Sequence, residues 1–214
     1  MADASKEIGI KEPPLKRPLD IFLSMLMIIL SIPVSLPIAL AIKIEDGGPV
    51  FYRQERWGRG GTRFRAYKFR TMAATSDEDF GIMQATENDP RITKVGRVLR
   101  AMGLDELPQL LNIFKGEMSF VGPRSLAVGE IVKDEKGSIF KYEDMPGFME
   151  RLRVRPGLTG LATIYVRKDI SPRRKFRYDL LYIRRQSFWL DVRLIALSFW
   201  ISFRGKWETR GRKV

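Results

Sequence analysis

The 214-residue sequence contains neither cysteine nor histidine. Their absence excludes a cysteine or histidine nucleophile, a histidine general base and the usual zinc sites built from sulfur and imidazole ligands. It also excludes disulfides, which is typical of proteins in a reducing compartment. Any chemistry must therefore use carboxylates, hydroxyl groups, lysine and arginine, with or without a hard metal ion.

Acidic residues are also scarce relative to basic ones. The 25 Asp and Glu residues against 38 Lys and Arg residues give a formal net charge of +13. This excess favours a polyanionic partner, which could be nucleic acid, an anionic membrane surface or a phosphorylated substrate. The length and a hydrophobic content of 44% predict one main core without a second full domain.

The 22 residues from 21 to 42 carry no charge. As a helix they would extend about 33 Å, enough for the roughly 30 Å hydrocarbon core of a bilayer. Pro33 and Pro37 each remove a backbone donor, and the Ser31 and Ser35 hydroxyls could compensate, which favours a sharp bend.

Basic residues flank this apolar segment on both sides, whereas a spanning helix carries them mainly on one side. We therefore expect a re-entrant helix-break-helix with its break at Ser31 and Pro33. A straight span and a cleaved signal peptide are the alternatives.

Two further segments complete the expected membrane-associated part. Residues 1–20 contain three prolines and the basic pair Lys16 and Arg17, so we expect a non-helical lead at the membrane surface. Residues 187–203 are apolar around only two charges, which predicts an interfacial helix. A buried core helix is the alternative.

Residues 50–72 predict a basic β-hairpin, because two strand-like runs flank a glycine-rich loop and aromatic residues alternate with cations. Such a hairpin suits lipid headgroups, a phosphate site or nucleic-acid bases, and a solvated strand face is the alternative. Residues 92–102 have helical spacing and would place Arg100 near the acidic pair described next. We also expect helices within 126–148 and after Pro172, and an acidic loop over 73–90 without a calcium pattern.

The stretch from 104 to 125 reads LDELPQLLNIFKGEMSFVGPRS. Asp105 and Glu106 open a predicted short helix that ends at Gly116. The two carboxylates could merely cap that helix or could do chemistry. Farther along, the glycine-rich turn 153–160 could bind an anion through its amides or be a plain tight turn.

A membrane-embedded segment, separated cation sites and an acidic pair together predict an enzyme that joins a phosphorylated soluble substrate to a phosphorylated lipid. A non-catalytic, membrane-tethered interaction protein is one alternative. A soluble nucleic-acid-binding protein is another, but it would leave the apolar segment unexplained.

Several motifs, spread in order over nearly the whole chain, carry a resemblance to a known family. They are KRPLD (16–20), YKFRTM (67–72), DPRITKVG (89–96), LDELPQL (104–110), Asn112, KGEMS (115–119), VGPR (121–124) and RPGLTG (155–160). This set closely resembles the bacterial sugar transferase family, the monotopic phosphoglycosyltransferases. Members commonly carry Ser-Pro at the membrane break, where this chain has Ile32-Pro33 preceded by Ser31.

The expected fold is α+β and membrane-associated. It comprises a juxtamembrane lead (1–20), a re-entrant membrane helix (21–43) and a small, mostly helical catalytic domain (44–214) with a β-hairpin and interfacial amphipathic helices. The resemblance places such a protein at the bacterial inner membrane with its catalytic domain on the cytoplasmic face.

The resemblance further implies transfer of a sugar 1-phosphate from a UDP-sugar to polyprenyl phosphate, typically undecaprenyl phosphate. The products are a polyprenyl diphosphate sugar and UMP, in the first membrane step of bacterial polysaccharide or glycoconjugate synthesis. Expected partners are therefore the UDP-sugar, polyprenyl phosphate and membrane lipid, with no nucleic acid, and a second copy of the chain in a homodimer is a further candidate.

By the same resemblance, Asp105 matches the nucleophile, which attacks the β-phosphorus in a ping-pong reaction through a phosphosugar-enzyme. Glu106 matches its partner, and the two carboxylates are the expected ligands of a Mg²⁺ cofactor. Four cations match active-site positions and are expected to bind phosphates, and a fifth is a further candidate: Lys68, Arg100, Arg124 and Arg167, and then Arg155.

Overall fold

The computed structural model describes residues 10–73, 89–133, 139–166 and 170–204. Its strands are β1 (Phe51–Trp57), β2 (Arg63–Phe69), β3 (Ser119–Val121), β4 (Ile131–Lys133), β5 (Ile139–Lys141) and β6 (Gly157–Thr159). Its α-helices are α1 (Lys16–Asp46), α3 (Lys94–Met102), α4 (Leu110–Lys115), α5 (Phe148–Arg151), α6 (Leu161–Tyr165), α7 (Pro172–Arg185) and α8 (Phe188–Phe203). Three 3-10 helices connect them: η1 (Arg59–Gly61), η2 (Leu104–Gln109) and η3 (Tyr142–Asp144). The predicted α+β class is confirmed.

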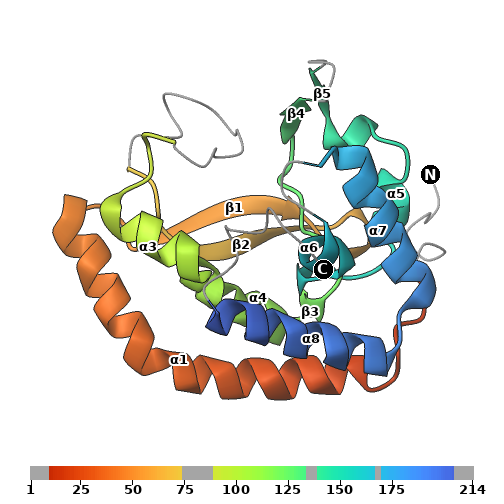
Figure 1. The fold of residues 1–214 in the computed structure, drawn as a ribbon, viewed down its shortest axis with the longest axis horizontal. Helices are drawn as coiled ribbons and strands as arrows, with labels where there is room; N and C mark the ends of the chain where they lie inside the picture. The colour runs from red at the N-terminus through yellow and green to blue at the C-terminus, as the bar shows by residue number, and fades with distance from the viewer. Residues whose placement is uncertain (1–9, 74–88, 134–138, 167–169, 205–214) are drawn as a thin grey trace.

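Helix α1 is one continuous helix of 31 residues that runs beneath α8 and α4 and then bends upward past α3 (Figure 1). Pro33 and Pro37 lie inside it without ending it. The Ser31 hydroxyl donates to the Ile28 carbonyl at 2.8 Å, not to the Ile29 carbonyl that Pro33 leaves unpaired. Helix α1 is therefore not interrupted at the predicted break, although it bends along its length (Figure 1).

Among the described residues, α1 is the one helix long and apolar enough to cross a membrane, and only 6% of its most apolar window is buried. It extends beyond the uncharged segment at both ends. Pro18 does not interrupt it, because proline is tolerated in a first helical turn.

The N-terminal end of α1 corrects the prediction that the lead is non-helical up to residue 20, because the helix already begins at Lys16. Lys16 is only 3% exposed, and its ammonium group contacts Asp191 Oδ2 at 2.7 Å, the Val121 carbonyl at 2.8 Å and the Tyr182 hydroxyl at 3.0 Å. Arg17 donates to the last carbonyls of α4, those of Ile113 at 2.6 Å and Phe114 at 2.7 Å. The basic pair thus bonds to the protein, because a buried charge needs partners.

The C-terminal end of α1 is also bonded to the rest of the chain. Glu45 accepts hydrogen bonds from the first amides of α3, with the Lys94 amide at 2.7 Å and the Val95 amide at 3.2 Å. Asp46 pairs with Arg70, which follows β2. Both ends of α1 therefore dock on the same domain.

The predicted β-hairpin is confirmed. Strands β1 and β2 pair antiparallel, from Phe51 opposite Phe69 to Trp57 opposite Arg63. Phe64 and Ala66 of β2 are buried, whereas Arg63 and Arg65 are exposed. One face of the hairpin therefore packs on the core, as period-two alternation requires.

The glycine-rich turn 153–160 allows two backbone segments to pack closely. Strand β6 pairs parallel with β3, and a Cβ on Gly157 would lie 2.1 Å from the Gly122 nitrogen. The Gly157 amide donates to the Pro123 carbonyl at 2.8 Å, and the Gly122 amide donates to the Thr159 carbonyl at 2.9 Å. These two amides are used within the protein, so Gly157 and Gly122 serve the close approach of two backbone segments.

The helix predicted within 126–148 is wrong over most of its length. Strands β4 and β5 form an antiparallel hairpin there, followed by η3 and α5. Ile131 is exposed while Val132 is buried, an alternation typical of a strand. The helices predicted at 92–102 and after Pro172 are confirmed as α3 and α7.

Helix α8 combines features of an interfacial helix and of a buried core helix, the two possibilities considered for it. Leu194 and Ile195 are buried in the core with α1 and β3, whereas Trp189 is 76% exposed and Trp200 is 53% exposed. A helix with one buried face and exposed tryptophans on another is suited to a water–lipid boundary. Its contact with lipid stays a prediction.

Candidate active site

The acidic pair lies in η2, between α3 and α4. Gly103 occupies the N-cap position with a φ of 69°, and no side chain caps this turn. The alternative in which Asp105 caps the helix is therefore wrong. The predicted single helix is instead divided into a 3-10 turn carrying the acids and the short helix α4.

Asn112 of α4 fixes this turn against β2. Its side-chain oxygen accepts from the Tyr67 amide at 3.1 Å, and its nitrogen donates to the Arg65 carbonyl at 2.8 Å and to Glu117 Oε2 at 2.7 Å. Asn112 is completely buried, so its bonds to β2 hold α4 and η2 beside the strand that carries Lys68.

Lys68 bridges the two carboxylates. Its ammonium nitrogen lies 2.6 Å from Glu106 Oε1 and 3.6 Å from Asp105 Oδ2. The side chains are 20% exposed for Lys68, 13% for Asp105 and 39% for Glu106. The cluster is thus partly open to solvent, as a site that receives a substrate must be.

The two carboxylates have opposite pKa shifts. Burial raises the pKa of Asp105, and the neighbouring Glu106 charge adds to the rise, while Lys68 and Arg100 oppose it. Burial also acts to raise the pKa of Glu106, but the Lys68 contact, with Arg124 and Arg56 nearby, lowers it to about 2. Glu106 therefore carries the firmly held negative charge, and Asp105 is the more basic member of the pair.

Arg100 is held beside the pair by α3. Gly96 brings α3 so close to the end of β2 that a Cβ there would lie 2.2 Å from the Thr71 carbonyl oxygen. Arg100 Nε then donates to the Thr71 hydroxyl at 2.8 Å. Because Arg100 opposes the rise in the Asp105 pKa, its charge acts on that carboxylate.

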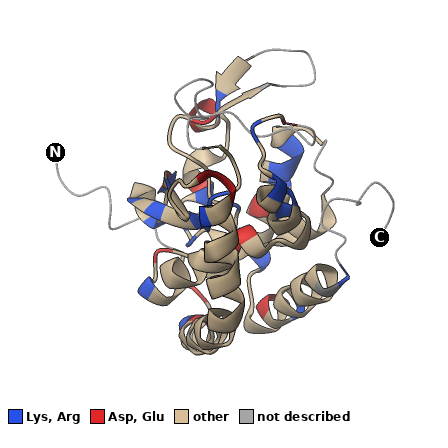
Figure 2. Cartoon of the chain, turned by 90° about the vertical axis from the view of Figure 1, so that its left-hand side faces the viewer, with Lys and Arg blue, Asp and Glu red and all other residues tan. Residues whose placement is uncertain are grey.

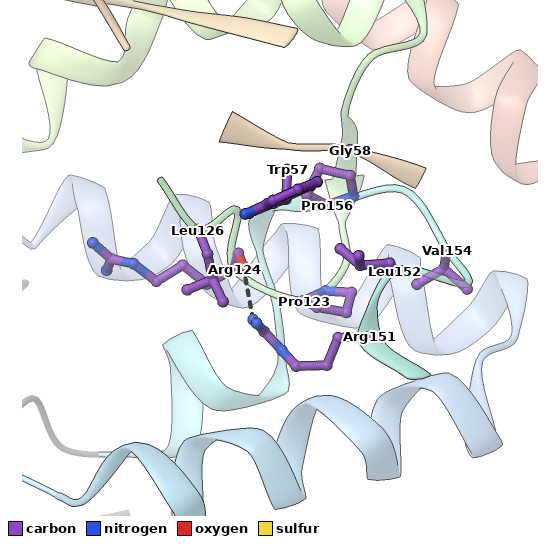
Figure 3. Close-up of a pocket in the computed structure, with 9 residues that line it drawn as sticks. All are labelled: Trp57, Gly58, Pro123, Arg124, Leu126, Arg151, Leu152, Val154 and Pro156. Carbon is purple, nitrogen blue, oxygen red and sulfur yellow. Dashed lines mark hydrogen bonds between the residues drawn. The ribbon is translucent and has the colours of Figure 1, made fainter. Parts of the chain in front are cut away.

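Arg124 follows β3 and has an exposed side chain that extends away from the small pocket in Figure 3, which Trp57 and Pro123 help to line. Its carbonyl accepts from Arg151 Nη2 at 2.7 Å, and Arg151 pairs with the buried Asp179 at 2.7 Å. The backbone at Arg124 is thereby fixed, while its guanidinium has no hydrogen bond or ion pair with any other residue that the structure describes. In the view of Figure 2, segments coloured for Lys and Arg and for Asp and Glu appear near the centre of the molecule.

The remaining predicted site residues lie elsewhere. Arg155 pairs with Glu12 and donates to the Gly116 carbonyl at 2.9 Å, so the structure does not bring it to the acidic pair. Ser31 and Pro33 lie within α1. Arg167 and most of the predicted acidic loop 73–90 are outside the described residues.

Sequence reasoning missed Arg56 on β1, whose charge acts on Glu106. The register places Tyr52 opposite Lys68 and Arg56 opposite the buried Phe64. Arg56 is therefore on the inward face of the hairpin, together with Lys68. The alternation of inward and outward residues in the hairpin could have identified Arg56 as an inward-facing arginine.

The donor set fits a hard cation only in part. In the described portion of the chain, no group of three or more acidic residues could hold a metal ion. Mg²⁺ binds oxygen and often uses one or two carboxylates together with substrate phosphates and water. Asp105 and Glu106 suit that arrangement.

Comparison with known proteins shows the family of this chain. Residues 11–205 match the model of the bacterial sugar transferase family, and the chain belongs to that family. It is 42% identical over 196 residues to the UDP-glucose:undecaprenyl-phosphate glucose-1-phosphate transferase of Klebsiella pneumoniae, covering 89% of this chain and 40% of the relative.

Two other relatives differ in name and length. The UDP-N-acetylgalactosamine-undecaprenyl-phosphate N-acetylgalactosaminephosphotransferase of Aeromonas hydrophila is 38% identical, over 85% of this chain and 42% of its own. The exopolysaccharide production protein PSS of Rhizobium leguminosarum bv. phaseoli is 39% identical, over 85% of this chain and 91% of its own. The chain thus spans about two fifths of the length of the named transferases and nearly all of the shorter relative.

Proposed function

We propose that this protein transfers a sugar 1-phosphate from a UDP-sugar to undecaprenyl phosphate, in an early membrane step of polysaccharide synthesis. The observation that carries the proposal is the Asp105–Glu106 pair, bridged by Lys68 and placed near arginines. The family match and the names of the relatives support the same reaction class.

The geometry suits Asp105 as the nucleophile. Its carboxylate oxygen would attack the β-phosphorus, the bond from that phosphorus to the bridging oxygen would break, and UMP would leave with the bond electrons. An oxygen of undecaprenyl phosphate would then attack the same phosphorus and release the Asp105 carboxylate. The products are undecaprenyl diphosphate sugar and UMP.

The surrounding cations suit a reaction between negatively charged groups. A carboxylate and a diphosphate repel each other, so Lys68, Arg100 and Arg124 would stabilise the charge on the transferred phosphoryl group. Mg²⁺, held by the two carboxylates with donor phosphate oxygens, would supply further charge neutralisation. Glu106 would keep Lys68 in place through their 2.6 Å contact.

We further propose that α1 enters and leaves one leaflet of the bacterial inner membrane, with the catalytic domain on the cytoplasmic face. A straight span would put the two ends of α1 on opposite sides of the bilayer. Both ends instead bond to one domain, through Lys16 and Glu45, and the exposed apolar side chains lie between them. The bend in α1 supports the re-entrant path.

The test is UMP release by detergent-purified protein with Mg²⁺ and undecaprenyl phosphate. UDP-glucose is the first donor and UDP-N-acetylgalactosamine the second, because both occur in the names of relatives. We expect UMP release that requires the metal and Asp105, with no more than about one equivalent per protein without undecaprenyl phosphate and continued turnover when the lipid is present. Folded protein that releases no UMP from these or other UDP-sugars would contradict the proposal.

A further inference from the structure

Arg56 was not among the site residues predicted from the sequence, and its side chain is held by several hydrogen bonds. Its Nη1 donates to the Ser125 carbonyl at 2.9 Å and to the Ser125 hydroxyl at 2.8 Å, and its Nη2 donates to Gln54 Oε1 at 2.9 Å. The chain pairing continues beside it, because the Trp57 amide donates to the Leu126 carbonyl at 2.9 Å. The guanidinium of Arg56 is therefore fixed next to the residue that follows Arg124.

These bonds leave hydrogen-bond donors unused. Arg56 Nε is buried and has no acceptor within the described residues. Nη2 carries two hydrogens, and the described residues provide one acceptor for them, Gln54. A guanidinium with unused donors beside a phosphate-transfer site is suited to bind phosphate oxygens, since its planar fork matches their geometry.

The charge of Arg56 is also unpaired in the described part of the chain. The described ion pairs include Arg70, Arg91, Arg151 and Arg155, each with a carboxylate. Arg56 and Arg124 form no such pair with a described carboxylate. Burial is the main cause that lowers the pKa of Arg56, and the nearby charge of Arg124 is the second. Glu106 and Glu130 act on Arg56 from beyond ion-pair distance and oppose this shift only in part, so positive charge remains for an anion that binds between the two arginines.

We propose that Arg56 and Arg124 form a two-arginine clamp for a phosphate group of the substrate, on the Glu106 side of the site. The inference rests on the proposed function. The ligand chemistry is a phosphate ester, which could be the diphosphate of the UDP-sugar or the monophosphate of the lipid. Arg56 is thereby a substrate-binding residue, and Ser125 positions it.

The test compares Arg56→Gln, Arg56→Lys and the matched control Arg65→Gln. Arg65 belongs to the same hairpin but lies on its exposed, outward face. Ser125→Ala, which removes one acceptor and keeps the charge, tests the positioning role. The first readout is binding of UDP to detergent-purified protein by calorimetry, which needs no turnover. The second is the KM for the UDP-sugar and, separately, for undecaprenyl phosphate.

We expect Arg56→Gln to weaken one phosphate ligand about tenfold or more, which corresponds to about 1.4 kcal/mol. Arg56→Lys should recover part of the loss, because it restores the charge without the fork. Weaker UDP binding with a raised donor KM assigns the clamp to the donor. Unchanged UDP binding with a raised lipid KM assigns it to the acceptor.

Both affinities within twofold of the Arg65→Gln control, in folded protein, would overturn the proposal. A lowered melting temperature with unchanged affinities would also overturn it, because Arg56 would then serve only the fold. If the wild-type protein binds UDP but releases no UMP, the proposed function fails while the binding comparison still tests Arg56.

Discussion

Two lysine–carboxylate clusters in this molecule share their chemistry but differ in how fully their groups are bonded. In the buried cluster, the Lys16 ammonium has three acceptors, and Asp191 binds Lys16 through one oxygen and the Tyr182 hydroxyl through the other. In the cluster of the candidate active site, the Lys68 ammonium makes one hydrogen bond among the described residues, to Glu106, and its ion pair with Asp105 is longer, at 3.6 Å. The first cluster is saturated and the second has bonding capacity left.

The two clusters also differ in the solvent exposure of their side chains. The side chains of Lys16 and Asp191 are 3% and 2% exposed, whereas Glu106 is 39% exposed. A buried charge must be satisfied by the protein because water cannot reach it. A site that receives a phosphate must instead keep donors and charge available. The comparison shows that spare bonding capacity, not the presence of an ion pair, distinguishes the candidate functional cluster.

Asp105→Asn gives the largest expected effect. Removing the carboxylate proposed as the nucleophile should lower kcat at least about 1,000-fold, with no loss of stability. The measurement is UMP release together with the melting temperature in detergent. A variant that retains turnover near the wild-type rate would contradict the nucleophile assignment.

Asp191→Asn should act in the opposite way, on stability. The substitution leaves Lys16 buried without its counter-charge, which typically costs about 3–5 kcal/mol. Thermal unfolding in detergent checks this value. Lys16→Met combined with Asp191→Leu should recover much of the loss, since it removes both charges together. An Asp191→Asn protein that is as stable as the wild type would remove the contrast between the two clusters.

Lys68→Met should lower kcat/KM for the donor by about 100-fold, because it removes a cation that we propose stabilises the transferred phosphoryl group. It should change stability little, since the carboxylates that Lys68 bridges are partly exposed. Single-turnover UMP release and a melting curve distinguish the two effects. A large drop in melting temperature with unchanged kinetics would place Lys68 with the structural cluster.

The pH profile separates Asp105 from Glu106. Burial and then the charge of Glu106 raise the pKa of Asp105, so activity should fall with decreasing pH as Asp105 becomes protonated. Glu106→Gln removes the neighbouring negative charge, so the pKa of Asp105 should fall and the acidic limb should move to lower pH. The measurement is kcat/KM against pH for both proteins. A limb that moves upward or stays in place would contradict this coupling.

Arg155 and Arg124 give the smallest expected contrast. Arg124→Ala should lower kcat/KM about tenfold through a lost phosphate contact. Arg155→Ala should change it less than about threefold, because Arg155 is paired with Glu12, and should instead lower stability by about 1 kcal/mol. Equal losses of kcat/KM would show that pairing with Glu12 does not remove Arg155 from substrate binding.

Much of this fold was predictable where one local pattern dominates. The uncharged run predicted the apolar helical segment of α1, though not its continuity through Pro33, the alternation predicted the β1–β2 hairpin, and helical spacing predicted α3. The segment 126–148 was misassigned because its strands are three residues long, too short for a clear period. The close packing of Gly157 against Gly122 depends on a parallel pairing between distant segments, which no local pattern contains.

In the candidate site, too, the sequence indicated residues that belong to local motifs but not the contacts between distant segments. The motif resemblance indicated Asp105, Glu106, Lys68, Arg100 and Arg124, and the structure brings the two acids and Lys68 together with Arg100 nearby. It could not indicate that Arg155 pairs with Glu12, which is 143 positions away in the chain. Nor could it indicate that Lys16 is buried, because its partner Asp191 comes 175 positions later.

The attachment of α1 at both ends has a consequence for acceptor choice. Glu45 joins the far end of α1 to the first amides of α3, whose last turn carries Arg100, and Lys16 joins the near end to the core. In the proposed orientation, this brace holds Asp105 at a constant height above the lipid headgroups. Acceptor selection would then depend on the depth of the lipid phosphate in the membrane and not on the length of the isoprenoid tail. Acceptors of different chain length should therefore react at similar rates.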